Sequence, residues 1–292
     1  MCSKFNRLIR FVPQSNPESI LIGEPIVKDQ DVGLATYENK LVEALVFSGK
    51  SVLEPGTATD KVEAVKKLLS PLEVGEVGTI RCIGLNYHQH ANEVKMAIPD
   101  IPVLFMKPAT ALGNPYPEPV VLPFLTQKDD CGDFESEVCV VIGKSCKNVS
   151  ESEALDHVLG YTASNDISSR AAQFAQSQWC FSKGFDGSCP IGPCIVSTGL
   201  VPNPGALHIR GLKNGKQMQN CSLNDLIFSV PKIVSFLSQG TTLLPGTIIL
   251  TGTPAGVGMG FDPKEYIREG DNFAVEILPH IGTLISTFEN EK

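Results

Sequence analysis

Three acidic residues, Asp133, Glu135 and Glu137, occupy alternate positions in the segment CGDFESEVCVVIGK. In a strand, side chains two residues apart point to the same face, so these carboxylates would lie side by side and repel each other. The apolar run VCVVIG that follows is typical of a strand buried on both faces, where ionised groups need a compensating partner. A divalent cation would supply it, because carboxylate oxygens are ligands that Mg²⁺, Mn²⁺ and Ca²⁺ prefer. The alternative is a solvated strand end whose acids are incidental.

A further acid, Asp166, lies in the segment YTASNDISSR. A strand is predicted to turn into a helix there, and a side chain at such a junction can reach into a neighbouring site. Arg170 and Gln173 follow, three residues apart on the predicted helix, so they share one of its faces. This arrangement places a guanidinium group and an amide close to the suspected metal.

His90 and Glu93, in the segment GLNYHQHANEVK, are also three residues apart and share a face if the segment is helical. A carboxylate beside one ring nitrogen fixes the tautomer and makes the other nitrogen a better base. The pair can therefore activate water or accept a proton. The alternative is an exposed, polar first turn of a helix. His88 falls on a different face and is predicted to lie on the surface.

Lys183 lies among glycines and phenylalanines in FSKGFDGSCPIGP. It can hold a carboxylate or an enolate, or it can be an ordinary surface lysine. The segment TIILTGTPAGVGMG reads as a strand followed by a glycine-rich turn. Its spacing is not that of a dinucleotide-binding loop, and it lacks the lysine and hydroxyl of a phosphate loop. Its backbone N–H groups can instead face a small anion such as a carboxylate.

The elements that must position these residues divide the chain into a small N-terminal domain, residues 1–75, and a larger domain, residues 80–292. Strand-like runs in the first are punctuated by Pro and Gly: RLIRFVP, SILIGEPIV and ALVFSGKSVL. The segment TATDKVEAVKKLLSPL has apolar residues at helical spacing and ends at Pro71, which predicts a helix over residues 57–72. The segment EVGEVGTI reads as the linker.

From about residue 80 onward, strand signals dominate. The candidates are TIRCIGL, PVLFM, EVCVVIG, LHIRGL, TIILTGT, NFAVEIL and TLISTF. Helices are expected after Ser150, which forms a capping box with Glu153, through DISSRAAQFAQS, and from near Pro231 to Gly240. Because strands do not alternate regularly with helices, a doubly wound fold is not favoured, and the sequence predicts a mixed α+β fold that is mostly β.

Composition excludes several classes of protein. The chain has 292 residues, is 42% hydrophobic, and carries a net charge of −8 without a basic patch, which argues against nucleic acid as a partner. No apolar run approaches the roughly 18 residues of a membrane span. Nine cysteines, an odd number without a CxxC pair, indicate a reducing compartment. The start, MCSKFNRLIRF, lacks the apolar core of a signal peptide and carries only a weak organelle-targeting signal. We therefore predict a cytoplasmic protein, with a mitochondrial location not excluded.

Six motifs in order resemble the fumarylacetoacetate hydrolase superfamily over roughly residues 80–288. They are CIGLNYHQHANE, PVLFMKPATAL, DFESEVCVVIGK, SNDISSRAAQ, SKGFDGSCPIGP and ILTGTPAGVG. Within the superfamily the chain looks most like the branch of acylpyruvases, oxaloacetate decarboxylases and oxaloacetate tautomerases. The resemblance implies a mixed-β roll, a homodimer, and a bound Mg²⁺ or Mn²⁺, with Ca²⁺ possible in a crystal. The first 75 residues resemble the small extra domain that some members carry.

The resemblance also implies roles for individual residues. Glu135, Glu137 and Asp166 match the metal ligands, and His90 and Glu93 match an acid–base dyad carried on a lid. The remaining matches are Lys183 near the metal-bound oxygens and, as substrate contacts, Arg170, Gln173 and Thr253. Leu85 and Ala109 depart from the pattern of many relatives, which have Arg and Ser there. Both changes remove polar groups near the expected pocket and are compatible with a more apolar substrate.

Together these features predict a metal-dependent enzyme that acts on 2-oxo (β-dicarbonyl) acids through an enolate stabilised by the metal. Hydrolysis of a carbon–carbon bond and decarboxylation are the expected reactions. The alternative is an isomerase, such as an oxaloacetate keto–enol tautomerase or a related biosynthetic isomerase. A non-catalytic metal-binding module is the third reading.

Overall fold

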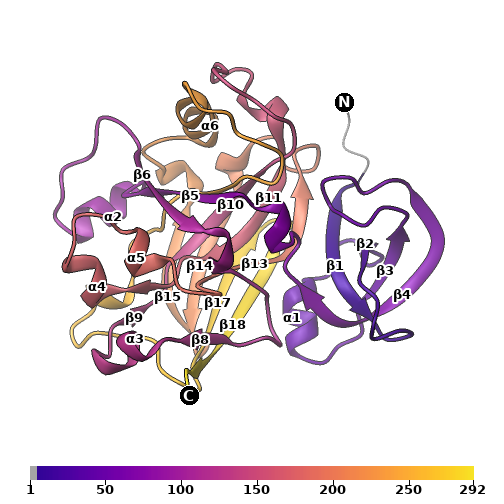
Figure 1. Ribbon diagram of the computed structural model, residues 1–292, viewed down its shortest axis with the longest axis horizontal. Helices are drawn as coiled ribbons and strands as arrows, with labels where there is room; N and C mark the ends of the chain where they lie inside the picture. The colour runs from indigo at the N-terminus through magenta and orange to yellow at the C-terminus, as the bar shows by residue number, and fades with distance from the viewer. Residues whose placement is uncertain (1–4) are drawn as a thin grey trace.

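The structure is a computed structural model that describes residues 5–292. It is mostly β, with a long main sheet, a five-stranded second sheet behind it, and a few short helices (Figure 1). The main sheet has the strand order β2-β3-β4-β1-β13-β11-β10-β16-β5-β6, and the second sheet has the order β15-β14-β17-β18-β8. This confirms the predicted fold class.

The N-terminal lobe forms one end of the main sheet, to the right in Figure 1. Its elements are β1 (Arg7–Pro13), β2 (Leu21–Pro25), α1 (Val32–Tyr37), β3 (Glu43–Phe47) and β4 (Ala58–Leu69). The three strands predicted in this region are confirmed. The helix predicted over residues 57–72 is wrong, because that segment is β4. Pairing with β1 and β3 on its two sides overrides the helical spacing, and Val62, on the expected apolar stripe, is 46% exposed.

The lobe is joined to the rest of the main sheet through β1, which pairs with β13 at Arg7↔Val196 and Leu8↔Ile195. The lobe and the larger part therefore share one continuous sheet. The division of the chain into domains near residue 75 stays a prediction. Of the stretch considered as a targeting signal, residues 1–4 lie outside the described residues, and Arg7–Pro13 form β1.

Beyond the lobe, the main sheet consists of β13 (Cys189–Ser197), β11 (Val158–Asn165), β10 (Ser136–Ile142), β16 (Ile248–Leu250), β5 (Thr79–Gly84) and β6 (Val103–Pro108). The second sheet consists of β15 (Lys216–Ser222), β14 (His208–Lys213), β17 (Asn272–Leu278), β18 (Gly282–Asn290) and β8 (Val120–Leu122). Two short pairings involve β7 (Leu112–Gly113), β9 (Gly132–Asp133) and β12 (Ser168–Ser169). All strand candidates of the larger region are confirmed.

Strand β10 lies inside the molecule and is buried along its whole length. Val138, Val140 and Ile142 belong to one hydrophobic cluster, and Cys139 and Val141 belong to another, as expected for alternating side chains on the two faces of a strand. The prediction of a strand buried on both faces is confirmed.

The helices are short and lie at the edges of the sheets: α2 (His88–Glu93), α3 (Phe124–Lys128), α4 (Arg170–Phe174), α5 (Cys180–Lys183) and α6 (Val230–Ser238). Single 3-10 turns cover Val74–Glu76, Ala109–Ala111, Ala154–His157, Pro204–Ala206, Leu223–Asp225 and Gly258–Gly260. Among residues 5–292, no helix combines the length and the apolar character that crossing a membrane requires.

The helix predictions have mixed outcomes. Helix α6 is confirmed, with a proline in its first turn and Ser229 accepting a hydrogen bond from the N–H of Lys232. The predicted helix through DISSRAAQFAQS is reduced to the five residues of α4. After Ser150 the N–H and the hydroxyl of Ser150 both donate to the Glu153 carboxylate, but only the 3-10 turn Ala154–His157 follows. That prediction of an α-helix is wrong, because the segment forms only this 3-10 turn and passes directly into β11 at Val158.

Candidate active site

The entry into β10 sets the direction of the two glutamates. Phe134 points toward the second sheet, where its ring stacks on Phe273 with centroids 4.2 Å apart. Ser136, two residues on, lies on the same side, and its N–H donates to Gln219 on β15. Because side chains alternate along a strand, Glu135 and Glu137 point the other way, away from the second sheet. One strand therefore packs against the second sheet with one face and presents two carboxylates on the other.

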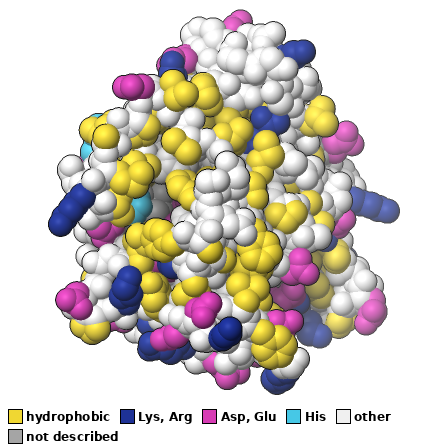
Figure 2. Space-filling view, turned by 60° about the vertical axis from the view of Figure 1, so that its left-hand side comes forward, with side chains coloured by type: hydrophobic (Ala, Val, Ile, Leu, Met, Phe, Trp, Pro, Cys, Tyr) yellow, Lys and Arg dark blue, Asp and Glu magenta, His cyan; other side chains and the backbone are white. Residues whose placement is uncertain are grey.

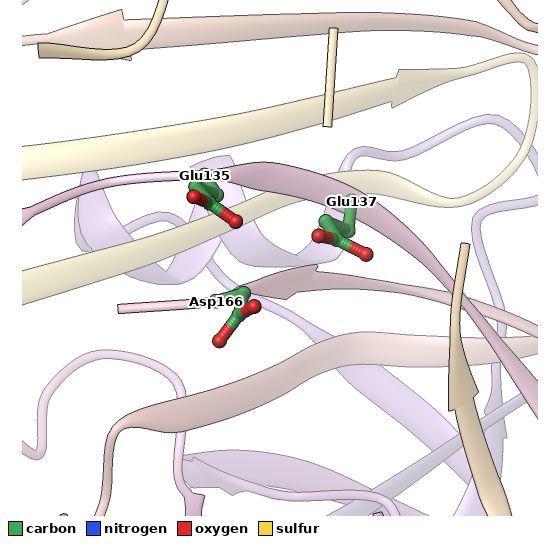
Figure 3. A group of neighbouring side chains, drawn as sticks. All are labelled: Glu135, Glu137 and Asp166. Atoms are coloured by element: carbon green, nitrogen blue, oxygen red, sulfur yellow. The ribbon is translucent and has the colours of Figure 1, made fainter. Parts of the chain in front are cut away.

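Strand pairing then brings the third carboxylate to the same place. Strand β10 runs antiparallel to β11 with Ser136 opposite Asn165, so Asp166, the next residue, reaches Glu135. The N–H of Asp166 donates to the carbonyl of Glu135 over 2.9 Å. One oxygen from each of Glu135, Glu137 and Asp166 lies within 4.8 Å of the others, and all three residues are buried (Figure 3).

These three residues fit a hard divalent ion. Their donors are all carboxylate oxygens, the ligand type that Mg²⁺, Mn²⁺ and Ca²⁺ share. Ligands on opposite sides of one ion lie about 4.2 Å apart for Mg²⁺ and about 4.6–5.2 Å apart for Ca²⁺, so the observed separations suit a single ion. The acidic cluster is therefore a possible metal site, and its donor set does not by itself select one of these ions.

Four buried carboxylates lie together here, those of Asp133, Glu135, Glu137 and Asp166. Buried cations compensate all of them except Glu137. The Lys183 ammonium donates to Glu135 Oε2 at 2.8 Å, to Asp166 Oδ2 at 2.7 Å and to the Ser168 hydroxyl at 2.7 Å. Arg170 Nη1 contacts Glu135 Oε1 at 2.8 Å. The ammonium group of a lysine has three N–H bonds, so Lys183 has none to spare. In this arrangement all three are used within the protein, and the expected contact of Lys183 with a bound substrate stays a prediction.

Two further contacts were not foreseen. Lys107, 1% exposed, donates to Asp166 Oδ1 at 2.6 Å and to the carbonyl of Ser188 at 2.7 Å. Asp133 does not join the metal cluster, because Oδ2 of its carboxylate pairs with Arg170 Nε at 2.7 Å. Four carboxylates and three cations leave one negative charge in this buried cluster.

The excess charge falls on Glu137. Among the described residues, its carboxylate has a hydrogen bond from the Gly252 N–H, at 2.6 Å, and no cation within ion-pair distance. Burial, then the negative charges of Asp166 and Glu135, raise the pKa of Glu137 well above its ordinary value. For Glu135 burial acts in the same direction, but Lys183 and Arg170 outweigh it and lower the pKa to about 2. A dication beside Glu137 would provide the missing compensation.

The dyad expected on the helix is formed. His90 Nδ1 lies 2.8 Å from Glu93 Oε2, and the N–H of Gly256 donates to Glu93 Oε1 at 2.9 Å. With the carboxylate holding a proton on Nδ1, the other ring nitrogen is left free to accept one. His88 is exposed, as predicted.

One cavity of about 510 Å³ brings the candidate residues together. It is lined by eight of the nine predicted site residues: His90, Glu93, Glu135, Glu137, Arg170, Gln173, Lys183 and Thr253. The ninth, Asp166, is fully buried beneath Lys183 and Lys107. The cavity thus joins an acid–base pair to the carboxylate cluster.

The remainder of the cavity wall is apolar. It is lined by Ile83, Leu85, Val94, Met96, Phe105, Phe174, Trp179 and Met259. The indole of Trp179 meets the ring of Phe105 edge to face, with centroids 5.4 Å apart. Figure 2 shows hydrophobic side chains spread over the face of the molecule that carries α2, α4 and α5. Of the two departures noted in the sequence, Leu85 lines the cavity and Ala109 does not.

Comparison with known proteins decides the family. Residues 79–289 match the family model described as "Fumarylacetoacetate (FAA) hydrolase C-terminal". The chain belongs to this family. The resemblance seen in the sequence is confirmed, and so is the predicted fumarylacetoacetate hydrolase-like fold, since solved members share it.

Three relatives indicate the range of activities in the fumarylacetoacetate hydrolase family. The chain is 45% identical to caffeoylpyruvate hydrolase of Neonothopanus nambi over 99% of its own length and 95% of the relative's. It is 38% identical to the mitochondrial oxaloacetate tautomerase FAHD2A of Bos taurus, over 87% and 82% of the two chains. A crystal structure of 2-hydroxyhepta-2,4-diene-1,7-dioate isomerase from Mycobacterium marinum is 31% identical, with a TM-score of 0.78 over 98% and 99% of the chains.

The chain is therefore an enzyme of the fumarylacetoacetate hydrolase superfamily that acts on a small-molecule substrate. The non-catalytic alternative is set aside. Because the relatives include a hydrolase, a tautomerase and an isomerase, family membership does not choose among these reactions.

Proposed function

We propose that this enzyme uses a divalent metal to cleave a carbon–carbon bond of a 2-oxo (β-dicarbonyl) acid, with hydrolysis of an acylpyruvate as the favoured reaction. The observation that carries the proposal is a single cavity lined by Glu135 and Glu137 of the carboxylate cluster and by the hydrogen-bonded pair His90 and Glu93. The name of the caffeoylpyruvate hydrolase, at 45% identity, supports hydrolysis.

The charge of the site favours an anionic substrate. When bound by Glu135, Glu137 and Asp166, Mg²⁺ or Mn²⁺ would act as a Lewis acid on the oxo-acid oxygens and stabilise the negative charge that develops there. The protein cluster carries one excess negative charge, so a dication would make it positive by one. A substrate with a single carboxylate would then restore neutrality in a buried site, where uncompensated charge is costly.

Three side chains would bind and orient the acid. Arg170 is 4% exposed, and its Nη2 has no hydrogen-bond partner among the described residues, although its other two nitrogens are held. A guanidinium N–H of this kind forms a strong, charge-assisted hydrogen bond with a carboxylate. The Gln173 amide oxygen accepts a hydrogen bond from the neighbouring nitrogen, Arg170 Nη1, at 2.8 Å. Thr253 accepts a hydrogen bond from Gln219 and keeps its own hydroxyl proton to donate.

The dyad would move the protons. His90 takes a proton from water while Glu93 stabilises the charge formed on the imidazole ring. The water oxygen attacks the distal carbonyl carbon, and the bond from that carbon to the adjacent CH₂ carbon breaks. The products are a carboxylic acid and an enolate of pyruvate, which accepts the proton at carbon. In decarboxylation, the bond to a leaving CO₂ would break instead, with the same residues around the enolate.

A substrate panel tests the proposal. Acylpyruvates, oxaloacetate and enol-oxaloacetate would be assayed with Mg²⁺ and with EDTA, following pyruvate release and enol absorbance. We expect acylpyruvate cleavage that depends on Mg²⁺. Turnover unaffected by EDTA would contradict the metal. Interconversion of enol and keto oxaloacetate without any cleavage would favour the second candidate, a tautomerase or isomerase, which the names of the bovine and mycobacterial relatives support.

The apolar wall predicts preference for a large acyl group. Replacing Trp179 by Ala should lower kcat/KM for an aromatic acylpyruvate by about 30-fold, the effect of losing roughly 2 kcal/mol of apolar and aromatic contact. Acetylpyruvate, which cannot reach this wall, should be affected by less than about threefold. Trp179→Phe, which keeps an aromatic ring against Phe105, is the matched control. Equal losses for the two substrates would show that Trp179 does not contact the acyl group.

We also propose that the enzyme is a homodimer and cytoplasmic, as the sequence indicated. Exposed apolar side chains on β6, the end strand of the main sheet, support self-association: Val103, Leu104 and Met106. The bovine relative carries "mitochondrial" in its name, so that location is the alternative.

A further inference from the structure

Asp133 is the one acid of the alternating set that lies outside the carboxylate triad. It is fully buried, at the end of β9, and each of its oxygens accepts two hydrogen bonds. Oδ1 accepts from the N–H groups of Phe134 and Gly258, at 2.9 and 2.7 Å. Oδ2 accepts from Met259 N–H at 3.0 Å and from Arg170 Nε at 2.7 Å. All its acceptor positions are filled, so it has no role as a ligand.

One of these contacts fixes the arginine of the site. The Asp133 carboxylate holds Arg170 at Nε, and Glu135 and Gln173 hold it at Nη1. The remaining nitrogen, Nη2, is the buried donor without a partner among the described residues. Because a guanidinium group is planar and rigid, holding Nε and Nη1 also determines where Nη2 points.

The other contacts fix the glycine-rich loop that supports the dyad. Asp133 binds the 3-10 turn Gly258–Gly260, and the same loop donates from Gly256 N–H to Glu93 at 2.9 Å. The turn also packs against that carboxylate: a Cβ atom at Gly260 would lie 2.6 Å from Glu93 Oε1. The approach to Asp133 requires glycine as well, since a Cβ at Gly258 would lie 2.5 Å from Oδ1.

We propose that Asp133 is a positioning residue that holds Arg170 and the loop 254–260 together. It thereby fixes the position of the substrate-binding guanidinium relative to the Glu93–His90 dyad. The inference rests on the proposed function, which assigns acid binding to Arg170 and proton transfer to the dyad. Asp133 does not itself line the cavity, and it has no hydrogen bond to Glu135, Glu137 or Asp166. It acts through the two segments that it joins.

The decisive variant is Asp133→Asn, which keeps the size of the side chain but turns one acceptor oxygen into an NH₂ group that faces two of the four N–H donors. We expect KM for an acylpyruvate to rise about 10-fold through Arg170, and kcat to fall about 10-fold through the dyad, the usual effect of losing a charge-assisted hydrogen bond. Mg²⁺ affinity, measured by calorimetry, should change by less than about twofold. Hydrogen exchange should become faster in residues 88–93 and 254–260.

Asp130→Asn is the matched control. Asp130 lies three residues earlier and pairs with Arg268 at 2.8 Å, but this ion pair is exposed. This substitution also removes a contact between an aspartate and an arginine, but the contact is at the surface. The kinetics and the hydrogen exchange of Asp130→Asn should therefore equal those of the wild type.

Gly260→Ala tests the loop separately, and it decides the matter if Asp133→Asn does not fold. The three atoms nearest to the added methyl group would all belong to the flexible Glu93 side chain. We expect kcat to fall with KM unchanged, and the effects of the two substitutions to be less than additive. Unchanged kcat in Gly260→Ala, wild-type kinetics in Asp133→Asn, or faster exchange throughout the main sheet in Asp133→Asn would each overturn the proposal. A wild-type enzyme inactive on every oxo acid would refute the proposed function instead, and the exchange measurement would still report on Asp133.

Discussion

Replacing Glu137 by Gln is expected to abolish Mg²⁺ binding and turnover while making the metal-free protein more resistant to heat. The raised pKa of Glu137 means that its carboxylate is costly to ionise inside the metal-free protein, first because of burial and then because of Asp166 and Glu135. A neutral amide removes that cost, together with an essential ligand. Calorimetric titration with Mg²⁺ and thermal unfolding in EDTA would measure the two effects.

The sign of the pH dependence follows from the direction of the shift. A carboxyl group whose pKa is raised on folding binds its proton more tightly in the folded state, so stability falls as pH rises above the unfolded value of 4.5. The gain in Glu137→Gln should therefore be present near neutral pH and vanish below about pH 4.5, where the group is protonated in both states. Unaltered Mg²⁺ affinity in this variant would contradict the metal assignment.

Glu135→Gln provides the matched comparison, because its environment has the opposite sign. Lys183 and Arg170 hold Glu135 ionised against the effect of burial, with a pKa of about 2. Removing this partner should also abolish metal binding, but it should destabilise the metal-free protein by about 3–5 kcal/mol at neutral pH. The stabilisation from Glu135 is lost as pH falls from 4.5 toward 2, so the difference from wild type should shrink in acid. Similar unfolding midpoints for the two variants would contradict the assignment of the excess negative charge to Glu137.

Replacing His90 by Ala should lower kcat for acylpyruvate cleavage by about 10²–10⁴-fold, the usual contribution of a positioned acid–base group. Because His90 is not part of the carboxylate cluster, Mg²⁺ affinity should stay at the wild-type level. Steady-state kinetics and calorimetry on the same preparation would separate the two properties. His88→Ala is the control, since it removes an exposed imidazole from the same short helix. Full activity in His90→Ala would exclude a catalytic role for the His90–Glu93 dyad.

The parts of the site that the sequence predicted are those that depend on local geometry. The alternation of Glu135 and Glu137 before a buried strand, and the three-residue spacing of His90 and Glu93, describe contacts within one element. The position of Asp166 at the end of a strand was also local information. These patterns retain their meaning whatever the rest of the chain does.

The parts that could not be predicted depend on contacts between distant segments. Lys107 and Asp166 are 59 positions apart, and Gln219 reaches Ser136 across 83 positions. A lysine at the end of the apolar strand PVLFM was the one available signal for Lys107, since a buried ammonium group needs an acid. Gln219 gave none. The prediction for residues 57–72 was wrong for a related reason. The apolar spacing of this segment suits a helix, and only pairing with β1 and β3 makes it a strand.

The pairing of β1 with β13 has a consequence for shortened versions of this chain. Strand β13 is buried at every residue, and β1 covers one of its long edges at Arg7 and Leu8. A shortened chain starting near residue 76 would uncover the backbone donors and acceptors of β13 at Ile195 and Val196, and an open edge of this kind is where other chains add strands. We therefore expect the N-terminal lobe to lower the tendency of the larger part of the chain to aggregate.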